Sequence, residues 1–158
     1  VRAAMELVHA WDLKDRDFTA ISDGQRQRVL LARAICQEPE IIVLDEPTAM
    51  LDPRGRQDVM DTVQKLNREK KITIVLITHH MEEAAQAQRV IVLDKGKIAA
   101  DGTPREVFCQ TELLHRIGLA APDTVELCYA LNQKGAGLPL DAIGPEECAQ
   151  ALYSWVKA

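Results

Sequence analysis

Apolar residues follow two different spacings along this chain, and the spacing decides which element each stretch predicts. Residues 1–11 and 54–68 place apolar side chains at helical intervals. Residues 41–44 and 72–77 are short continuous apolar runs, which are typical of strands buried on both faces of a parallel sheet. Helices and buried strands are thus predicted to alternate, and this alternation indicates an α/β sheet domain.

Two further helices have their first residues marked by capping signals. Ser22 is followed three positions later by Gln25, a pair that forms a capping box, and this helix is expected to end before Pro39. Thr103 followed by Pro104 predicts a second capped helix start. Both signals are local, so they predict the start of each helix independently of the rest of the fold.

A β-hairpin is predicted between these two helices. The sequence Asp-Lys-Gly at 94–96 separates the apolar runs 89–93 and 97–100, and a glycine in such a turn favours hairpin geometry. A short alanine-rich helix is expected before the hairpin, at 81–88.

The pattern of predicted elements changes near residue 118, from alternating strands and helices to helices alone. Two helices that each begin at a proline are predicted at 122–134 and 145–157, joined by a linker of Gly, Ala, Leu and Pro. We therefore expect an α/β domain over 1–117 and a helical appendage over 118–158. The apolar faces of the two helices consist of Leu127, Cys128 and Leu131, and of Cys148, Leu152, Trp155 and Val156. A unit this small cannot bury both faces alone, so it is expected to pack on the core or on a second copy.

The composition fits a globular protein with few aromatic rings. Apolar residues make up 47% of the 158 residues and aromatic residues only 4%, so Leu, Ile, Val and Ala must fill the core. The net charge of −5 argues against nucleic acid as a main partner, because phosphate-backbone binding needs clustered Lys and Arg. The short basic stretch at 68–71 is interpreted as a solvated helix end.

Cysteine usage indicates a reducing compartment. The four cysteines stand far apart without a Cys-x-x-Cys pair, so we interpret them as small buried apolar residues. No apolar run approaches the ~18 residues of a membrane span, and no signal peptide opens the chain. Because the first residue is Val1, the sequence is expected to begin within a longer protein, and a soluble cytosolic piece is the prediction.

Two segments combine polar groups suited to binding or moving phosphate. Ser22 and the backbone N–H groups behind it can bind an anion at a helix start, and the alternative is an ordinary N-cap. Asp45 and Glu46 follow an apolar strand, which rarely ends in two acids without a function, although a solvated strand end is the alternative. Adjacent strand residues point to opposite sides, which suits two distinct roles for the two carboxylates.

A third segment, Thr78-His79-His80, ends the second apolar strand. A histidine at a strand end is often structural. A zinc pair is not expected, because adjacent histidines on a strand point apart and no third ligand is evident.

In this order, the segments resemble motifs of ATP-binding-cassette (ABC) ATPases. The resemblance covers about residues 1–108, with Ser22–Gln25 and the following Arg-Gln-Arg as the signature motif, 41–46 as Walker B, 49–52 as the D-loop and Thr78-His79 as the switch histidine. Residues 94–108 resemble the end of an importer-type ABC ATPase. The helical tail resembles the C-terminal extension of energy-coupling-factor (cobalt- and vitamin-uptake) ATPases.

The resemblance implies roles for the strand-end residues. Asp45 holds Mg²⁺ through water, and Glu46 orients or deprotonates the water that attacks ATP. His79 contacts the γ-phosphate, whereas His80 is peripheral. ATP and Mg²⁺ are therefore the expected cofactors.

The resemblance also assigns residues to the ATP bound by an opposite subunit. Ser22, Gly24 and Gln25 contact its γ-phosphate, and Asp52 helps to couple the two sites across the dimer. Asp23 departs from the family pattern, in which a second glycine is usual. A carboxylate there is expected to face phosphate charge and to disfavour the contact with ATP.

No Gly-x-x-x-x-Gly-Lys-Ser/Thr loop, the P-loop that cradles nucleotide phosphates, occurs in the sequence. The predicted fold class is therefore α/β: an incomplete P-loop NTPase core of the ABC type, with a mostly parallel sheet and a small C-terminal helical appendage. In this family the P-loop strand lies between the strands at 72–77 and 89–93. A gap with an exposed strand edge is expected between them.

The predicted function is that of a fragment of the ATP-hydrolysing subunit of an energy-coupling-factor importer for metal ions or vitamins, inactive alone. The intact protein is expected at the inner face of the cell membrane, with a second ATPase subunit and transmembrane subunits as partners. The alternatives are a non-transport ABC ATPase and a non-catalytic dimerisation or regulatory module. The transported substrate cannot be deduced, because the membrane subunits select it.

Overall fold

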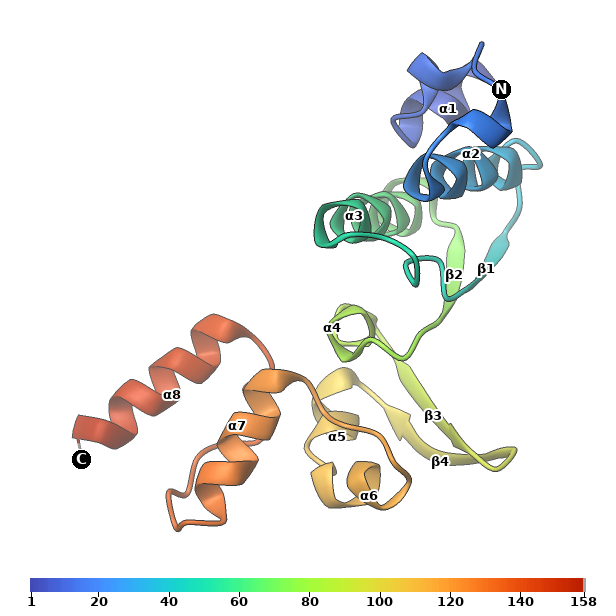
Figure 1. The fold of residues 1–158 in the computed structure, drawn as a ribbon. Helices are drawn as coiled ribbons and strands as arrows, with labels where there is room; N and C mark the ends of the chain where they lie inside the picture. The colour runs from blue at the N-terminus through green and yellow to red at the C-terminus, as the bar shows by residue number, and fades with distance from the viewer. Residues whose placement is uncertain (158) are drawn as a thin grey trace. The chain divides into compact units, whose positions relative to one another are not determined.

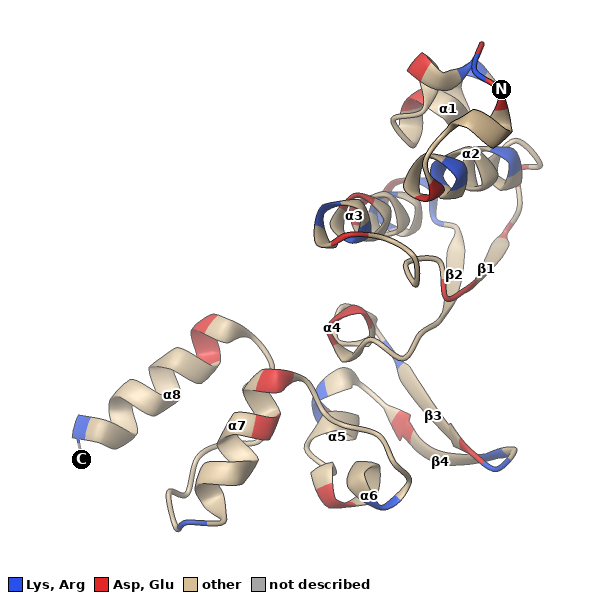
Figure 2. Cartoon of the chain, in the orientation of Figure 1, with Lys and Arg blue, Asp and Glu red and all other residues tan. Residues whose placement is uncertain are grey.

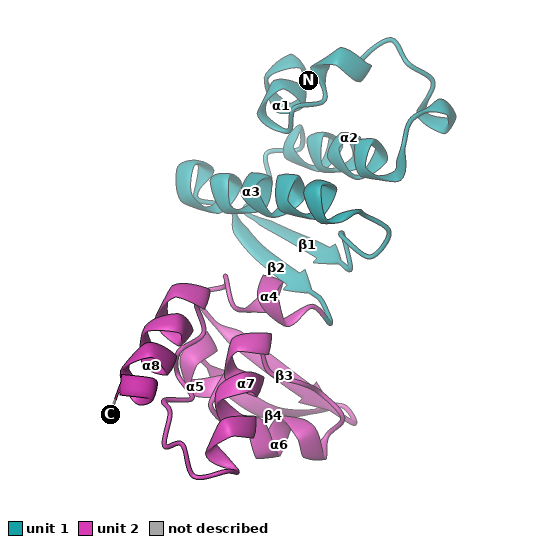
Figure 3. Cartoon of the chain, turned by 60° about the vertical axis from the view of Figure 1, so that its left-hand side comes forward, with its two compact units in different colours: residues 1–79 teal, residues 80–158 magenta. Residues whose placement is uncertain are grey.

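A computed structural model describes residues 1–157, and the chain divides between His79 and His80 into two compact units (Figures 1 and 3). The predicted boundary between functional domains lies elsewhere, at 117–118. The observed division reflects packing, and the division by function stays a prediction.

Unit 1 holds a two-stranded parallel sheet and the helices that cover one face of it (Figure 3). Its elements are α1 (Arg2–Leu7), the 3₁₀ helices η1 (Trp11–Leu13) and η2 (Phe18–Ala20), α2 (Asp23–Ile35), β1 (Ile41–Asp45), α3 (Pro53–Lys70) and β2 (Thr73–Ile77). The strands pair from Ile41 opposite Thr73 to Asp45 opposite Ile77, so both end at the same edge. The parallel strands, the helix that was expected over 54–68 and the helix that was expected to end before Pro39 are confirmed.

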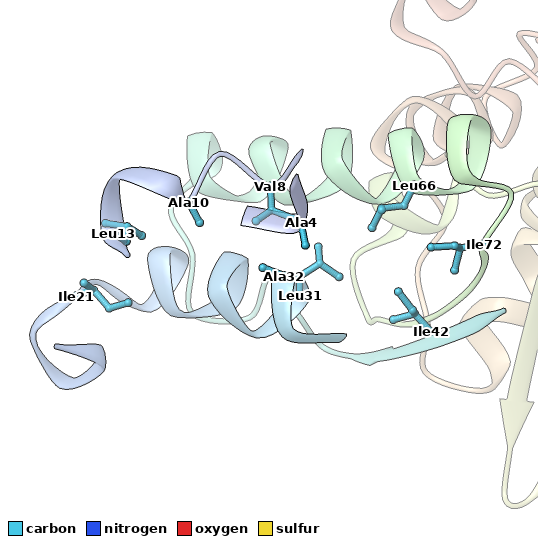
Figure 4. Close-up of a cluster of buried hydrophobic side chains, with 10 residues drawn as sticks. All are labelled: Ala4, Val8, Ala10, Leu13, Ile21, Leu31, Ala32, Ile42, Leu66 and Ile72. Carbon is cyan, nitrogen blue, oxygen red and sulfur yellow. The ribbon is translucent and has the colours of Figure 1, made fainter. Parts of the chain in front are cut away.

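The core of unit 1 contains aliphatic side chains, as the composition predicted. Val8 at the end of α1, Leu31 from α2, Leu66 from α3 and Ile42 from β1 belong to one buried cluster (Figure 4). Val8 and Leu66 have no exposed surface. Burial of several such side chains, at about 1.5–3 kcal/mol each, holds the helices on the sheet.

The expectation that both strands are buried on two faces is wrong for this chain. Ile41 and Val43 of β1 are 58% and 62% exposed, and Val75 and Ile77 of β2 are exposed on the same face. The side chains alternate across the pleat, and the helices cover only the face that includes Ile42. A continuous apolar run therefore shows that both faces of these strands are suited to burial, but the helices of this chain cover only one face.

The first helix is shorter than its apolar pattern predicted. The pattern extends over residues 1–11, but α1 ends at Leu7 because His9 takes a left-handed backbone conformation with φ 52°. The 3₁₀ turn η1 then carries Leu13 into the core.

Unit 2 is built on an antiparallel hairpin. Its elements are α4 (Met81–Ala84), β3 (Val90–Asp94), β4 (Lys97–Gly102), α5 (Pro104–Phe108), α6 (Thr111–Arg116), α7 (Asp123–Asn132) and α8 (Pro145–Lys157). The predicted hairpin is confirmed: Lys95 and Gly96 both have positive φ, as tight two-residue hairpin turns require. The Thr103 capping box is also present. Helix α6 was not expected, and α4 is shorter than predicted.

The helical tail packs on the rest of unit 2. Val125 of α7 is fully buried in a cluster with Val107, Phe108 and Leu114. A second cluster joins α7 to α8 through Cys128, Leu138 and Cys148. Figure 2 shows acidic residues at the start of α8 and a basic residue at its end, the arrangement that the helix dipole favours.

The cysteines divide into two kinds. Cys128 and Cys148 are buried as expected, with their Sγ atoms 3.8 Å apart, and burial raises the pKa of the Cys128 thiol to about 11. Cys36 and Cys109 are exposed, so the expectation of burial is wrong for them. Cys36 is the C-cap residue of α2 and Cys109 that of α5, so both lie at helix ends.

Strands β2 and β3 belong to different sheets, each with two strands, in the described part of the chain. The strand that the family resemblance would place between them is not among the described elements. The gap expected between the two segments stays a prediction.

Candidate functional site

The carboxyl ends of β1 and β2 bring two sequence-predicted site residues together. Asp45 is the last residue of β1 and lies opposite Ile77, and the backbone N–H of Glu46 donates to the carbonyl of Ile77 at 2.9 Å. Parallel pairing therefore fixes Glu46 beside the segment that follows β2. That segment begins with Thr78 and His79.

Glu46 and His79 are in direct contact. His79 Nδ1 lies 2.9 Å from Glu46 Oε1, with both side chains about half exposed. A neutral imidazole in this contact carries its proton on Nδ1 and donates it to the carboxylate, which fixes the tautomer and the ring orientation. The pair is thus a carboxylate held by an imidazole at a solvent-accessible strand end.

The backbone at Glu46 is unusual. Its φ is 42°, in the left-handed region that residues other than glycine rarely adopt. The chain leaves the strand direction at this residue, after Asp45 has completed β1. Conformations of this kind persist where the surroundings enforce them, and they cluster at functional sites.

His80, the neighbour of His79, lies in a different setting. It is the N-cap residue of α4 and is partly buried. The structure thus places the ring of His79 against Glu46 and assigns His80 to the start of a helix.

The predicted capping box at the start of α2 is confirmed. Ser22 Oγ accepts from Gln25 N at 3.3 Å, and Gln25 Oε1 accepts from Ser22 N at 2.9 Å. The Ser22 hydroxyl acts as an acceptor here, so its proton can serve a ligand. The N–H groups of Asp23 and Gly24 begin a 13-residue helix and have no intrahelical acceptor.

A groove of about 390 Å³ joins this turn to the segment between β1 and α3. Ser22, Gly24 and Gln25 line one side of it, and Leu51 and Asp52 line the other. A Cβ at position 24 would lie 3.3 Å from Leu51 Cδ2, so glycine lets the two segments approach closely.

Asp52 has a structural task in this arrangement. It is the N-cap residue of α3, and its Oδ1 accepts from Gly55 N at 2.7 Å. A Cβ at position 55 would lie 2.9 Å from the same oxygen, which indicates why glycine follows three residues later. The capping bond orients the carboxylate at the rim of the groove.

Asp23 lines the groove and also has an ion-pair partner on its own helix. Arg26 Nη1 donates to Asp23 Oδ1 at 3.0 Å. Sequence reasoning missed this contact, although an Asp–Arg pair three positions apart on a helix is a recognised signal for it.

The predicted site residues thus form two groups in unit 1. The first is the strand-end group of Asp45, Glu46 and His79, and the second is the groove group of Ser22, Gly24, Gln25 and Asp52. The strand-end group does not line the groove.

Comparisons with known proteins agree with the motif resemblance. The family model described as ABC transporter matches residues 1–49. The energy-coupling factor transporter ATP-binding protein EcfA1 of Caldanaerobacter subterraneus subsp. tengcongensis is 49% identical over 152 residues, which cover 96% of this chain and 55% of that protein. The EcfA1 of Clostridioides difficile is 44% identical, with the same coverage.

Solved structures give the same result for the fold. CbiO1 from Clostridium perfringens, described as part of an ABC transporter complex, matches with a TM-score of 0.64 and 33% identity, over 73% of this chain and 46% of that one. A metal-chelate type ABC transporter in an inward-facing conformation matches with a TM-score of 0.68 and 33% identity, over 73% and 45%. The predicted fold class and family resemblance are confirmed.

The chain spans about half the length of the curated relatives it matches. Among residues 1–157, no helix has the length and apolar character needed to cross a bilayer.

Proposed function

We propose that this chain, which belongs with the ABC transporter ATP-binding proteins, is the C-terminal part of the ATP-hydrolysing subunit of an energy-coupling-factor importer. The intact subunit, meaning the longer protein that contains this chain, would bind ATP between two subunits and use its hydrolysis to move a membrane partner. Similarity to EcfA1 proteins over 96% of the chain supports the assignment.

The observation that carries the proposal is the contact between Glu46 and His79 at the ends of two parallel strands. Glu46 is proposed to orient or deprotonate an attacking water, and His79 to hold Glu46 and contact the γ-phosphate. Phosphoryl transfer requires mainly such positioning and charge stabilisation. The 2.9 Å contact supplies that positioning without a bound ligand.

The strand end also offers a carboxylate that fits Mg²⁺, the ion expected to accompany ATP. Asp45 offers an exposed carboxylate beside Glu46, and Mg²⁺ prefers oxygen ligands, often through water. Bound Mg²⁺ would neutralise charge on the phosphates. Asp45 is therefore proposed to hold the ion, and Glu46 to act on the water.

The groove group is proposed to bind the γ-phosphate of the ATP held by a second subunit. Ser22 and the N–H groups of Asp23 and Gly24 lie at a helix start, where the helix dipole favours an anion. Asp52, on the other side of the groove, is proposed to couple the two sites. The separation of this group from Glu46 and His79 supports a site completed by two subunits.

A second ATPase subunit and transmembrane transporter subunits are the proposed partners, which places the intact subunit at the inner face of the membrane. The relatives named as energy-coupling factor transporter ATP-binding proteins support this proposal. Nucleic acid is not a proposed partner, because a net charge of −5 disfavours binding to a phosphate backbone.

The 158-residue chain by itself is expected to show no ATP hydrolysis above background, whereas the intact subunit is active. The chain has no P-loop, whose lysine and backbone donors hold the β- and γ-phosphates. Phosphate release measured on both proteins tests this. Micromolar ATP binding by the chain, with turnover that Glu46→Ala abolishes, would contradict it and favour a self-sufficient site.

We also propose that the helical appendage contributes to subunit association. Its inner face packs on unit 2, but α8 leaves Tyr153 and Val156 exposed by 57% and 76%. These two residues are three positions apart and share one side of the helix. An exposed apolar strip of this kind favours contact with another surface.

The double substitution Tyr153→Ser and Val156→Ser is expected to weaken the nucleotide-free dimer of the intact subunit in sedimentation velocity experiments. Deleting the appendage is a poorer test, because it would remove Val125 from the core of unit 2. Ser154→Ala, an exposed change on a different side of α8, is the matched control. An unchanged dimer would assign the appendage to packing within the chain alone.

A further inference from the structure

The carboxylate of Asp23 opposes the proposed binding of phosphate at the start of α2. Asp23 is the first residue of the helix, where the dipole favours an acid, and it lines the groove together with Ser22 and Gly24. Its side chain is largely exposed. An uncompensated carboxylate here would repel an anionic phosphate, so the turn needs a counter-charge.

Arg26 supplies that charge and is fixed in place. Its Nη1 donates to Asp23 Oδ1 at 3.0 Å, while Nε donates to the carbonyl of Phe18 at 3.1 Å and Nη2 to that of Thr19 at 2.9 Å. The guanidinium cannot leave Asp23 without breaking bonds to two backbone carbonyls. This anchoring distinguishes the pair from an ordinary mobile surface ion pair.

The turn that anchors Arg26 is itself ordered by local bonds. Asp17 Oδ1 accepts from Thr19 N at 2.8 Å and from Thr19 Oγ1 at 2.6 Å. These bonds, led by that from the Thr19 hydroxyl, hold the pKa of the Asp17 carboxyl below its usual range. The guanidinium also lies 6.0 Å from the centre of the Phe18 ring. The anchor for Arg26 therefore exists without a ligand.

We propose that Arg26 is a positioning residue that offsets the Asp23 carboxylate and thereby lets this signature turn accept the γ-phosphate of ATP. The inference rests on the proposed function. It has a specific consequence: loss of Arg26 should impair ATP use only while position 23 carries a charge.

A double-mutant cycle in the intact subunit tests this consequence, with turnover measured against MgATP concentration. Arg26→Ala is expected to raise KM about tenfold when Asp23 is present, the scale of one charge interaction. In the isosteric, uncharged Asp23→Asn background, the same change is expected to raise KM less than about threefold. Equal increases in both backgrounds would overturn the proposal.

Salt provides a readout that a purely structural role would not move. Added salt should lower the raised KM of Arg26→Ala, because salt screens the exposed Asp23 carboxylate. It should have no such effect in the Asp23→Asn background. Arg68→Ala, at the exposed end of α3, is the matched control and should leave KM unchanged. A salt response that is the same in both backgrounds counts against charge compensation.

The result also separates this inference from the proposed function. A wild-type intact subunit without ATP turnover contradicts the proposed function. Urea unfolding of the 158-residue chain then tests the pairing, using the wild type, the two single variants and the double variant. Losses of unfolding free energy that are coupled support the anchored pair, and additive losses overturn it.

Discussion

Glu46→Gln in the intact subunit is expected to lower ATP turnover by about 10²- to 10⁴-fold, the range for loss of a general base, while ATP binding is retained. The amide keeps the size of the side chain and its contact with His79 Nδ1, which lies 2.9 Å from the carboxylate. It removes the charge that orients and deprotonates water. Binding is preserved because no other group of the site is changed.

The measurement combines steady-state phosphate release with equilibrium binding of ATP. Glu69→Gln, an exposed change at the end of α3, controls for the loss of one negative charge. If the turnover of Glu46→Gln stays within about twofold of the wild-type value, Glu46 has no part in the chemical step.

His79→Ala is expected to lower turnover about 10²-fold, comparable to the loss of one preorganised polar group in other active sites. His80→Ala is expected to have an effect of less than about threefold, since His80 begins α4 while His79 contacts Glu46. The neighbouring histidine is thus a matched control within the same chain. A larger loss from His80→Ala would assign the switch role to His80.

The combination of Glu46→Gln with His79→Ala sharpens this test. Residues that act as a unit show strongly non-additive losses. The double variant is therefore expected to be about as slow as Glu46→Gln alone. If the two losses multiply, the 2.9 Å contact between the side chains has no part in turnover.

Much of the local structure could be predicted because its signals lie within a few residues. The capping boxes at Ser22 and Thr103 depend on a partner three positions away, and the turn at 94–96 depends on Gly96. The order of the motifs likewise indicated the family resemblance and the fold class, which the comparisons confirm. Predictions of this kind need no knowledge of the tertiary contacts.

Burial was less predictable because it depends on which surfaces the chain can cover. Ile41 and Val43 belong to an apolar run that predicts a strand covered on both sides, but only one side of β1 is packed. The packing of Val125 against Phe108 could not be deduced from helix periodicity either. Periodicity identifies the apolar face of an element but not the element that meets it.

The sequence by itself determined which residues can take part in the proposed chemistry: Asp45 and Glu46 after one strand, and His79 after the next. Only the tertiary structure decided their arrangement. Parallel pairing of β1 with β2 brings Glu46 and His79, 33 residues apart, to 2.9 Å. The physical reason is range. Capping and turn formation are settled by neighbouring residues, whereas the contact between two strand ends exists only once the sheet has formed.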